Sequence, residues 1–421
     1  MSRPAATSLL AALAACLLSL GGCGGGGGSS GASGSGNPPA VPNVVDVVVD
    51  QGPVDTASSS RLPIGSVDTP FVTITLCAHG TDTCQTIDHI SVDTGSSGLR
   101  VIASALSGPL AAALGQVTDA QGRALAECLP FADGYSWGSV KQADARIGGE
   151  QASGISIQVI GDAALPTVPD ACSSGGATQE DTVTAFGGNG ILGISTFRQD
   201  CGALCVTSTF PGVYFGCPTS STCTPTTVAL ANQVWNPVAL FAADNNGAIL
   251  ALDRVDDAGA GSASGSLIFG IDTRSNNALG TATVLAVDPA SGNLSVTFNS
   301  QRLANSFIDS GSNGYFFDDS SIAGCTRPTE KGFYCPASTQ QLSATITSNT
   351  GVVALVSFSV ANADSLFSKG SGSFSAFDDL GGTNPDSGSF DFGLPFFMGR
   401  RVYAAIEQST TSAGAGPFVA Y

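Results

Sequence analysis

Short apolar runs separated by turn-forming residues constrain the fold of this chain more than any other feature. Runs such as "FVTITLCAHG", "ISIQVIGD" and "LSVTFNS" are rich in β-branched residues and end at Gly, Asn or Ser. Such runs are typical of β-strands, and little of the chain shows the 3.6-residue period of a helix. We therefore expect an all-β architecture with a few short helices, one of them in the Ala/Leu-rich stretch from Ala103 to Leu114.

The size and charge of the chain limit the number of domains and the classes of partner that we expect. Its 421 residues, of which 43% are hydrophobic, suffice for one large domain or two lobes. Lys and Arg total 15 against 33 Asp and Glu, a net charge of -18, and no basic stripe is present, so nucleic acid is not an expected partner. The acidic excess is compatible with work in acidic surroundings, and a solvated acidic surface explains the same charge.

The first residues have the pattern of an export signal. Residues 1–22 carry one early Arg, a Leu/Ala run and small residues before Cys23, which predicts a signal peptide too short to be a stable membrane span. The sequence "LGGC" that ends at Cys23 resembles the bacterial lipobox, whose cysteine is acylated. The alternative is an ordinary signal peptide with an incidental cysteine.

The next segment, residues 23–60, begins "CGGGGGSSGASGSG" and is expected to be a flexible lipidated tether. Acyl chains on Cys23 would anchor the protein to a membrane without a spanning helix. Gly24 follows the cysteine, where Asp favours inner-membrane retention in lipoproteins of the kind resembled. We therefore expect a lipoprotein of the bacterial cell envelope, in the outer membrane and facing the periplasm or the cell surface.

Cysteine content agrees with export. An even number of cysteines remains when Cys16 and Cys23 are set aside, which predicts five disulfides. These candidates are Cys77, Cys84, Cys128, Cys172, Cys201, Cys205, Cys217, Cys223, Cys325 and Cys335. Close spacing suggests that Cys77 pairs with Cys84, Cys217 with Cys223, and Cys325 with Cys335, while the complete connectivity stays open. With only His79 and His89 and no doubled CxxC motif, we expect neither a metal site nor a cofactor.

One Asp-containing turn occurs three times. Asp93 in "SVDTGSSGLRV" and Asp309 in "FIDSGSNGYFF" are both preceded by apolar residues and followed by Gly and further apolar residues, which indicates strand, turn and strand. Asp386 in "NPDSGSFDF" follows Pro385, where no strand can deliver it, so we assign it to a surface loop. Asp93 and Asp309 are therefore the candidate pair.

A second pattern repeats behind this pair. Ile191, Leu192 and Gly193 follow Asp93 by about 100 residues, and Phe397, Met398 and Gly399 follow Asp309 by about 90. An apolar pair that ends in Gly suits a buried strand running close beside another backbone segment. The same order in both halves predicts two homologous lobes, residues 61–240 and 241–421.

On these motifs, the chain from about Ser66 onward resembles the pepsin-like aspartic proteases. In that family each of two lobes contributes one Asp-[Thr/Ser]-Gly loop and one apolar-apolar-Gly strand. The resemblance implies an all-β, bilobal fold with a cleft between the lobes and a catalytic pair. The implied catalytic residues are Asp93 and Asp309, supported by Thr94, Gly95, Ser96, Ser310, Gly311 and Ser312, with Thr94 and Ser310 holding the two loops together. The stretch "LPFFMGRRVYAAIE", together with the lipobox, also resembles an uncharacterised family of predicted bacterial lipoproteins.

A flap hairpin is also implied by the resemblance. The stretch "FADGYSWGSVKQADARIGG" is similar to the hairpin that closes over substrate in this family. Its expected flap residues are Phe131, Asp133, Gly134, Tyr135 and Trp137. Phe131 stands where the family usually has Tyr, so the flap hydroxyl would be missing. Tyr135 and Trp137 are nearby candidates to replace it, although a Trp in this position also suits a packed strand.

Two carboxyl groups close enough to share a proton can hydrolyse a peptide, because one activates a water while the other protonates the carbonyl oxygen. We therefore expect a secreted, lipid-anchored aspartic endopeptidase that acts on peptides or unfolded protein. The alternative is a catalytically weak or inactive pepsin-like lipoprotein that binds peptides or a partner protein. A β-rich lipoprotein with accidental Asp turns and a paired-carboxylate glycosidase are further alternatives. A Ser-His-Asp hydrolase fits poorly, because the chain has only two histidines.

Overall fold

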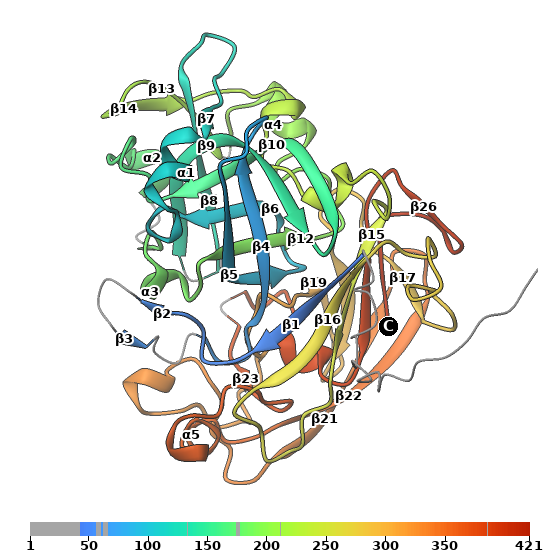
Figure 1. The fold of residues 1–421 in the computed structure, drawn as a ribbon. Helices are drawn as coiled ribbons and strands as arrows, with labels where there is room; N and C mark the ends of the chain where they lie inside the picture. The colour runs from blue at the N-terminus through green and yellow to red at the C-terminus, as the bar shows by residue number, and fades with distance from the viewer. Residues whose placement is uncertain are drawn as a thin grey trace, which may run out of the picture. The chain divides into compact units, whose positions relative to one another are not determined.

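Strands account for most of the regular structure in the computed structural model (Figure 1). The structure describes residues 43–55, 60–61, 66–132, 134–173, 177–210, 212–384 and 386–421, all within one unit, Val41–Tyr421. The predicted all-β fold class is confirmed. Because the signal peptide, Cys23, Gly24 and Asp133 lie outside the described residues, the predictions about them stay predictions.

The first half of the chain contributes one series of strands. They are β1 (Val44–Val49), β2 (Val54–Asp55), β3 (Ser60–Arg61), β4 (Pro70–Ala78), β5 (Cys84–Asp93), β6 (Ser97–Ile102), β7 (Gly115–Gln116), β8 (Ala124–Pro130), β9 (Gly134–Ile147), β10 (Glu150–Ile160), β11 (Thr178–Gln179), β12 (Gly190–Ile194), β13 (Tyr214–Thr219) and β14 (Thr222–Pro225). Most of them join a 17-stranded sheet, whereas β2 and β3 pair only with each other.

The second half contributes strands to the same sheet and forms a sheet of its own. Its strands are β15 (Gly247–Leu252), β16 (Ala263–Phe269), β17 (Val284–Ala286), β18 (Leu294–Phe298), β19 (Gln301–Ile308), β20 (Tyr315–Phe316), β21 (Gln340–Thr347), β22 (Val353–Val360), β23 (Gly381–Gly382), β24 (Asp391–Phe392), β25 (Arg401–Ala405), β26 (Thr410–Thr411), β27 (Gly414–Ala415) and β28 (Phe418–Ala420). A separate seven-stranded sheet has the order β22-β21-β18-β19-β24-β20-β23. Strands β15, β16, β17, β25 and β28 extend the larger sheet.

The helices are short. They are α1 (Gly108–Ala113), α2 (Asp170–Ser173), α3 (Val183–Phe186), α4 (Ala203–Thr207) and α5 (Ala363–Phe367), with 3-10 turns η2 (Ala103–Ala105), η3 (Leu230–Asn232), η4 (Pro237–Leu240), η5 (Pro328–Glu330), η6 (Lys369–Ser371) and η7 (Leu394–Phe397). The helix expected over the Ala/Leu-rich stretch is divided into η2 and α1, because Ser107 caps a new helix by accepting a hydrogen bond from the Leu110 amide. Within the described residues, no helix combines the length and apolar character that a bilayer span requires.

The same three-strand unit occurs in both halves of the chain. In the first half, β12 runs parallel to β5 and antiparallel to β6, so that Leu192 lies between Val92 and Leu99. In the second half, β24 runs parallel to β19 and antiparallel to β20, so that Phe392 lies between Ile308 and Tyr315. These central residues are buried in one hydrophobic core, which holds the strand ahead of each Asp turn rigidly in place.

One predicted strand was wrong. Phe397 is the last residue of η7, Met398 follows it and forms only an isolated bridge with Leu252, and Gly399 lies in a turn with a φ of 71°. The residue that corresponds to Gly193 is Gly393. A Cβ atom on Gly393 would lie 2.1 Å from the Gly314 carbonyl oxygen, so only glycine allows this close approach. The overlooked signal is "FDFG", in which an acid replaces the first residue of the expected apolar pair.

The predicted tether also needs correction at its C-terminal end. Strand β1 lies within residues 23–60 and pairs with both β16 and β4. Val47 and Val49 of this strand are buried in the core. The run "VVDVVV" consists mostly of β-branched valines, and one face of the strand, Val45, Val47 and Val49, is entirely apolar, which favours a strand over a flexible linker. The folded body therefore begins before the boundary expected from composition.

Five disulfides join the ten candidate cysteines. The three pairs suggested by spacing are present, namely Cys77–Cys84, Cys217–Cys223 and Cys325–Cys335, and the other two are Cys128–Cys172 and Cys201–Cys205. A chain with this many disulfides is typical of an oxidising, extracytoplasmic compartment.

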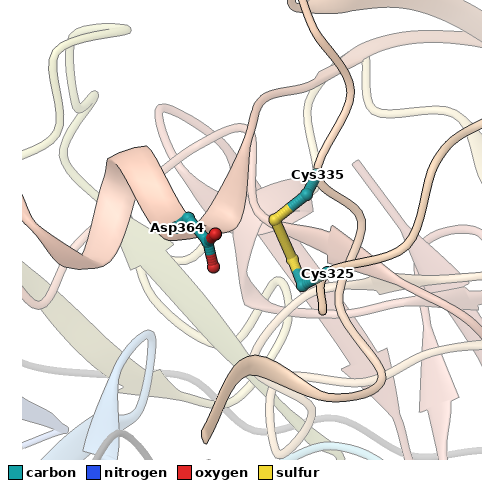
Figure 2. A group of neighbouring side chains, drawn as sticks. All are labelled: Cys325, Cys335 and Asp364. Carbon is teal, nitrogen blue, oxygen red and sulfur yellow. A yellow bond between two sulfur atoms is a disulfide. The ribbon is translucent and has the colours of Figure 1, made fainter. Parts of the chain in front are cut away.

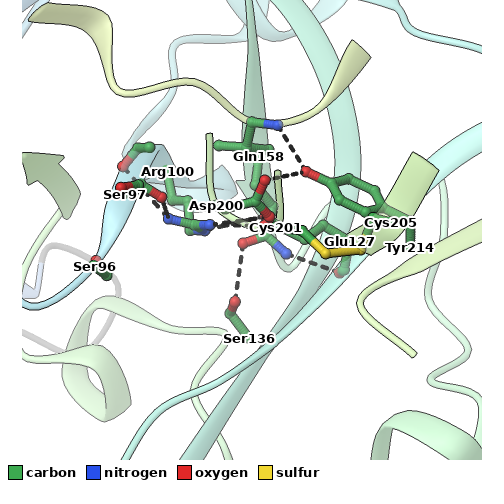
Figure 3. A network of polar contacts seen from close by, with 12 residues as sticks. Ser96, Ser97, Arg100, Glu127, Ser136, Gln158, Asp200, Cys201, Cys205 and Tyr214 are labelled. Atoms are coloured by element: carbon green, nitrogen blue, oxygen red, sulfur yellow. Dashed lines mark hydrogen bonds and ion pairs between the residues drawn. A yellow bond between two sulfur atoms is a disulfide. The ribbon is translucent and has the colours of Figure 1, made fainter. Parts of the chain in front are cut away.

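A buried charge network lies behind the first Asp turn (Figure 3). The Arg100 guanidinium donates to both carboxylate oxygens of Glu127, at 3.1 and 2.7 Å, and also to the Ser97 carbonyl oxygen at 2.9 Å. Its Nη2 lies 3.7 Å from Asp200, whose other carboxyl oxygen accepts a hydrogen bond from Tyr214. Arg100 and Glu127 are fully buried, so this ion pair ties the strand after the Asp93 turn to the flap-side strand β8.

The network gives a prediction for stability. Replacing Arg100 by Met should lower the free energy of unfolding by about 3–5 kcal/mol, because Glu127 would stay buried without its partner. Urea unfolding with the disulfides intact measures this loss. The matched control is Arg327→Met, which removes an arginine that is 63% exposed and 3.7 Å from Asp364. That control should cost less than about 1 kcal/mol. Equal losses in the two variants would contradict the role of the buried network.

Candidate active site

The two candidate Asp residues meet across the two halves of the chain. Asp93 ends β5 and Asp309 directly follows β19. A Cβ atom on Gly95 would lie 2.6 Å from Cγ of Asp309, and one on Gly311 would lie 2.7 Å from Oδ1 of Asp93. Each glycine therefore backs onto the carboxyl group of the other turn, and any larger residue would push that carboxyl group away.

Reciprocal hydrogen bonds lock the two turns together. The Thr94 amide donates to Ser310 Oγ at 3.1 Å, and the Ser310 amide donates to Thr94 Oγ1 at 2.9 Å. The same hydroxyl groups donate across the interface, Thr94 to the Ile308 carbonyl at 3.2 Å and Ser310 to the Val92 carbonyl at 2.8 Å. All four bonds connect residues more than 200 positions apart. Thr94 and Ser310 thus occupy the arrangement that the family resemblance implies.

The turns supply hydrogen-bond donors to their own carboxyl groups. Asp93 accepts from the Gly95 amide at 2.6 Å, from the Ser96 amide at 3.2 Å and from the Ser96 hydroxyl. Asp309 accepts from the Gly311 amide at 2.7 Å and from the Ser312 hydroxyl at 2.9 Å. Because each carboxyl group is held by donors on both of its oxygens, its plane is fixed before any ligand arrives.

Burial and like charge act together on Asp309. Burial raises the pKa of Asp309 well above its ordinary value, and the charges of Asp93 and Asp391 and a hydrogen bond to Asp93 raise it further. The Gly311 amide opposes this shift. Two carboxyl groups in hydrogen-bonding contact cannot both be ionised without strong repulsion, so the pair shares a proton.

The pair lies in a cavity of about 380 Å³. Its wall combines the two Asp turns with Pro130, Phe131 and Ala132 from the tip of the β8–β9 hairpin, and with apolar residues such as Leu294 and Val419. No Lys, Arg or His of the described residues lines it. The cavity therefore joins an apolar wall to an acidic floor, which suits a ligand that can donate hydrogen bonds to the floor.

The flap residues have different roles from those expected. Phe131 lines the cavity and packs edge-on against Phe186 at 5.8 Å between ring centroids. Tyr135 and Trp137 are buried in β9, with the Tyr135 hydroxyl 3.5 Å from Gln179 and the Trp137 indole donating to the Leu165 carbonyl at 2.9 Å. Because neither lines the cavity, neither replaces the hydroxyl that Phe131 lacks. Gly134 is also buried in β9.

A third acid in the cavity was missed by the sequence analysis. Asp391, at the start of β24, is only 5% exposed and lines the cavity together with Asp93 and Asp309. Asp386, which shares the Asp-Ser-Gly-Ser pattern, is exposed and accepts a hydrogen bond from the Gly388 amide in a local turn, as expected of a surface loop. The useful signal was therefore the strand "FDFG" and not the repeated turn before it.

One group of three potential metal ligands lies together in the described part of the chain. Cys325, Cys335 and Asp364 lie close together, but the two sulfur atoms form a disulfide and carry no thiolate (Figure 2). The histidines bond to other acids, His79 to Asp144 at 2.7 Å and His89 to Asp50 at 3.4 Å.

A larger hollow of about 730 Å³ lies away from the Asp pair. It is lined by residues including Asp88, His89 and Asn189, and by residues 51–54. Neither Asp93 nor Asp309 lines this hollow. We therefore place the candidate site at the Asp pair.

Comparisons with known proteins add a family and a fold neighbour. No curated protein matches the sequence. Among solved structures, the chain is similar to the aspartic proteinase from Irpex lacteus, with a TM-score of 0.48 and 16% sequence identity, covering 90% of this chain and 96% of the other. A family model described as "Protein of unknown function (DUF3443)" matches residues 39–421. Because the match spans most of its length, this chain belongs to the DUF3443 family of proteins of unknown function.

Proposed function

We propose that this protein is an aspartic-type endopeptidase that hydrolyses peptide bonds with Asp93, Asp309 and an activated water. The observation that carries the proposal is the interlocked pair of Asp turns, in which each turn's glycine backs onto the other turn's carboxyl group. Two carboxyl groups held this close share one proton. At any moment one of them is charged and can act as a base, while the other is protonated and can act as an acid.

The hydrogen bonds indicate which Asp acts as the base and which as the acid in the first step. Asp93 receives three donors from its turn, whereas Asp309 receives two. Donors stabilise the charged form of a carboxyl group, so the shared proton resides on Asp309 and Asp93 is the base. Asp93 takes a proton from the attacking water while Asp309 protonates the substrate carbonyl oxygen. Asp93 then passes its proton to the amide nitrogen while Asp309 takes one back from a hydroxyl of the tetrahedral diol, so that the C–N bond breaks and an amine and a carboxylic acid are released.

The spacing of the acids favours peptide hydrolysis over glycoside hydrolysis. Paired glycosidase carboxyl groups stand about 5–9.5 Å apart, to leave room for a sugar or a water. Here the interlocked turns bring the two carboxyl groups side by side, since a Cβ atom on Gly311 would lie 2.7 Å from Oδ1 of Asp93 and 3.1 Å from Oδ1 of Asp309. A peptide or an unfolded protein segment is therefore the substrate class that we assign to the cavity.

One observation favours the second candidate function, peptide binding without efficient cleavage. The hairpin tip presents Phe131 to the cavity, and this ring has no hydroxyl to orient the substrate or the water. A ligand would still be enclosed by the hairpin tip and the apolar wall. In this second function the chain is a pepsin-like lipoprotein that captures a peptide or a partner protein.

We further propose that the protein is exported and lipid-anchored. In this proposal residues 1–22 are a signal peptide, Cys23 is acylated, and the anchor lies in the outer membrane of a bacterial envelope. The five disulfides support an extracytoplasmic location. The short segment between Cys23 and strand β1 then connects the anchor to the folded body.

The first test removes each acid separately. Asp93→Asn and Asp309→Asn should each reduce kcat/KM on a mixed peptide library at least about 10³-fold, because the pair loses its base or its shared proton. Asp386→Asn is the matched control, since it changes an exposed acid in the same sequence motif, and it should retain wild-type activity. Cleavage by all variants at the wild-type rate would contradict the proposed pair.

A wild type without activity would favour the second function. In that case, fluorescence anisotropy should show the same peptides binding to the wild type and to Asp309→Asn. Absence of both cleavage and binding would refute the two candidate functions together.

The second test concerns pH. Burial is the largest cause of a raised pKa in seven acids, Asp68, Glu150, Asp200, Asp309, Asp378, Asp379 and Asp391, and the pKa of Asp379 is raised to about 7. Between about pH 4 and these raised values, the folded state holds protons that the unfolded state has released, so stability falls as pH rises. We expect a larger free energy of urea unfolding at pH 5 than at pH 8, as suits an acid protease.

The Asp379→Asn variant serves as the control, because its free energy of unfolding should change less with pH near neutrality than that of the wild type. In five other acids burial favours the neutral form, but hydrogen-bond donors together outweigh it and lower the pKa, and in a sixth, the exposed Asp288, hydrogen-bond donors lower the pKa. These are Asp119, Asp144, Asp162, Asp272, Asp288 and Asp319. Their stabilisation is lost only as pH falls below about 4, which places the stability maximum in mild acid. A maximum at alkaline pH would contradict this balance.

The third test concerns the anchor. Cys23→Ser should move the protein from the membrane fraction to the soluble fraction, because no acyl group can be attached. Fractionation followed by intact-mass measurement checks both the location and the loss of lipid mass. Serine replacement of Cys16, the other cysteine in the first 25 residues, is the control and should leave the protein in the membrane fraction. Continued membrane association of the Cys23 variant would refute the anchor.

A further inference from the structure

Asp391 occupies a position that is apolar in the other half of the chain. In the first half, Ile191 on β12 pairs with the residue two positions before Asp93. In the second half, Asp391 on β24 pairs with the residue two positions before Asp309. The two positions are equivalent in the duplicated three-strand unit, so a carboxyl group lies where an isoleucine also fits. An ionisable group in such a position indicates a chemical role.

The carboxyl group of Asp391 is not satisfied by the folded chain. The residue is only 5% exposed, and its Oδ1 has no hydrogen-bond partner among the described residues. Glu127, another buried acid, accepts hydrogen bonds at both carboxylate oxygens from the Arg100 guanidinium, at 3.1 and 2.7 Å. A buried carboxyl oxygen without a donor costs free energy, and a ligand that brings a donor removes this cost.

Asp391 lies in the same cavity as the catalytic pair. It lines the cavity of about 380 Å³ together with Asp93 and Asp309. The described residues that line this cavity include no Lys, Arg or His, so three acids lie there without a cation from the protein. The shared proton reduces the negative charge of the pair but leaves Asp391 without a counter-charge. A positively charged ligand group is therefore the electrostatic complement of this cavity.

Part of the cavity wall is apolar and suits the stem of a long side chain. Phe307 pairs with Asp391 across strands β19 and β24, and Val287, Leu294 and Val419 line the same cavity. Lys and Arg side chains pack their aliphatic stems against apolar surface while the charged head reaches a polar group. The combination of an apolar wall and an unpaired acid therefore fits a long basic side chain better than a short cation or a wholly apolar side chain.

A basic side chain also offsets the cost of burying the acid. Burial raises the pKa of Asp391 well above its ordinary value, which means that burial disfavours the charged form. An ammonium or guanidinium group within hydrogen-bond distance favours the charged form. An apolar side chain of the same shape would leave the acid buried and unpaired, so the cavity discriminates between the two.

We propose that Asp391 forms a subsite that binds a basic side chain of the substrate, Lys or Arg, beside the scissile bond. The proposal deepens the endopeptidase function and rests on it, because it names the substrate class of the same cavity. Among peptides and unfolded protein segments, the enzyme selects those with a basic residue next to the cleaved bond. Asp391 binds the cation and takes no part in the proton transfers between Asp93, Asp309 and water.

The test compares Lys with norleucine, which has the same aliphatic stem without the ammonium group. The starting peptide is the one that the wild type cleaves fastest in the mixed library, blocked at both ends, and the residues beside its scissile bond are replaced in turn by Lys or norleucine. At one of these positions the wild type should cleave the Lys peptide with a kcat/KM about 100-fold above that of the norleucine peptide.

Two replacements of Asp391 assign this preference to its carboxyl group. In Asp391→Asn and in Asp391→Ile, which restores the residue of the first lobe, the ratio of kcat/KM for Lys over norleucine should fall to about 1 or below. Asp386→Asn is the matched control and should keep the wild-type ratio. A ratio near that of the wild type in both Asp391 variants, or no preference in the wild type, would overturn the proposal.

A binding measurement separates the subsite from catalysis. Asp309→Asn is titrated with fluorescent oligoalanine peptides, blocked at both ends, that carry one central Lys or norleucine. By anisotropy the Lys peptide should bind at least about 10-fold more tightly, and the double variant Asp309→Asn/Asp391→Asn should lose this difference. Circular dichroism melting with intact disulfides establishes that each variant is folded.

The two measurements distinguish the failure of the subsite from the failure of the endopeptidase function. Tighter binding of the Lys peptide, in a protein that cleaves nothing, would support the subsite and refute only the endopeptidase function. Cleavage of the Lys and norleucine peptides at equal rates would overturn the subsite in an active endopeptidase. Equal affinity of Asp309→Asn for the two oligoalanine peptides would also overturn the subsite.

Discussion

The contact between two like-charged groups is the constraint on which this structure depends. Two carboxyl groups from distant parts of the chain repel one another unless they share a proton, so the backbone must hold them together. The four hydrogen bonds between Thr94, Ser310 and the strands before them do this, and Gly95 and Gly311 remove the side chains that would keep the turns apart. The buried strands β5, β12, β19 and β24 make this arrangement rigid, because their central residues belong to one core.

Burial also affects acids outside the catalytic pair. Burial raises the pKa of other acids well above their ordinary value, among them Asp68 and Asp200. Arg100, buried behind the Asp93 turn, donates to the Ser97 carbonyl oxygen and to Glu127. An acid-rich protein that folds best with neutral carboxyl groups gains stability in mildly acidic surroundings, where a shared proton on a catalytic pair is also retained. The folded state and the proposed catalytic pair are therefore both favoured by mildly acidic pH.

Much of the fold and the centre of the site were predictable from local patterns. Alternating β-branched runs gave the fold class, and the Asp turns at Asp93 and Asp309 were recognisable because apolar strand residues flank both of them. The errors have physical causes as well. Gly399 matched an apolar-apolar-Gly pattern that several segments satisfy, whereas the register that selects Gly393 depends on pairing with β19 and β20. Asp391 was overlooked because an acid within a strand reads as exposed unless its neighbours are known.

The sequence by itself determined the β-rich fold class, the two Asp turns and three of the disulfide pairs, because strand periodicity, turn chemistry and cysteine spacing are local properties of the chain. It indicated which two acids could form a pair and which Asp-Ser-Gly-Ser turn, that of Asp386, could not. Only the tertiary structure decided what surrounds the pair: that Phe131 and not Tyr135 reaches the cavity, and that Asp391 lines the same cavity as a third acid. These depend on strand register and on burial, which arise from contacts between residues far apart in the chain and leave no signal in a short segment.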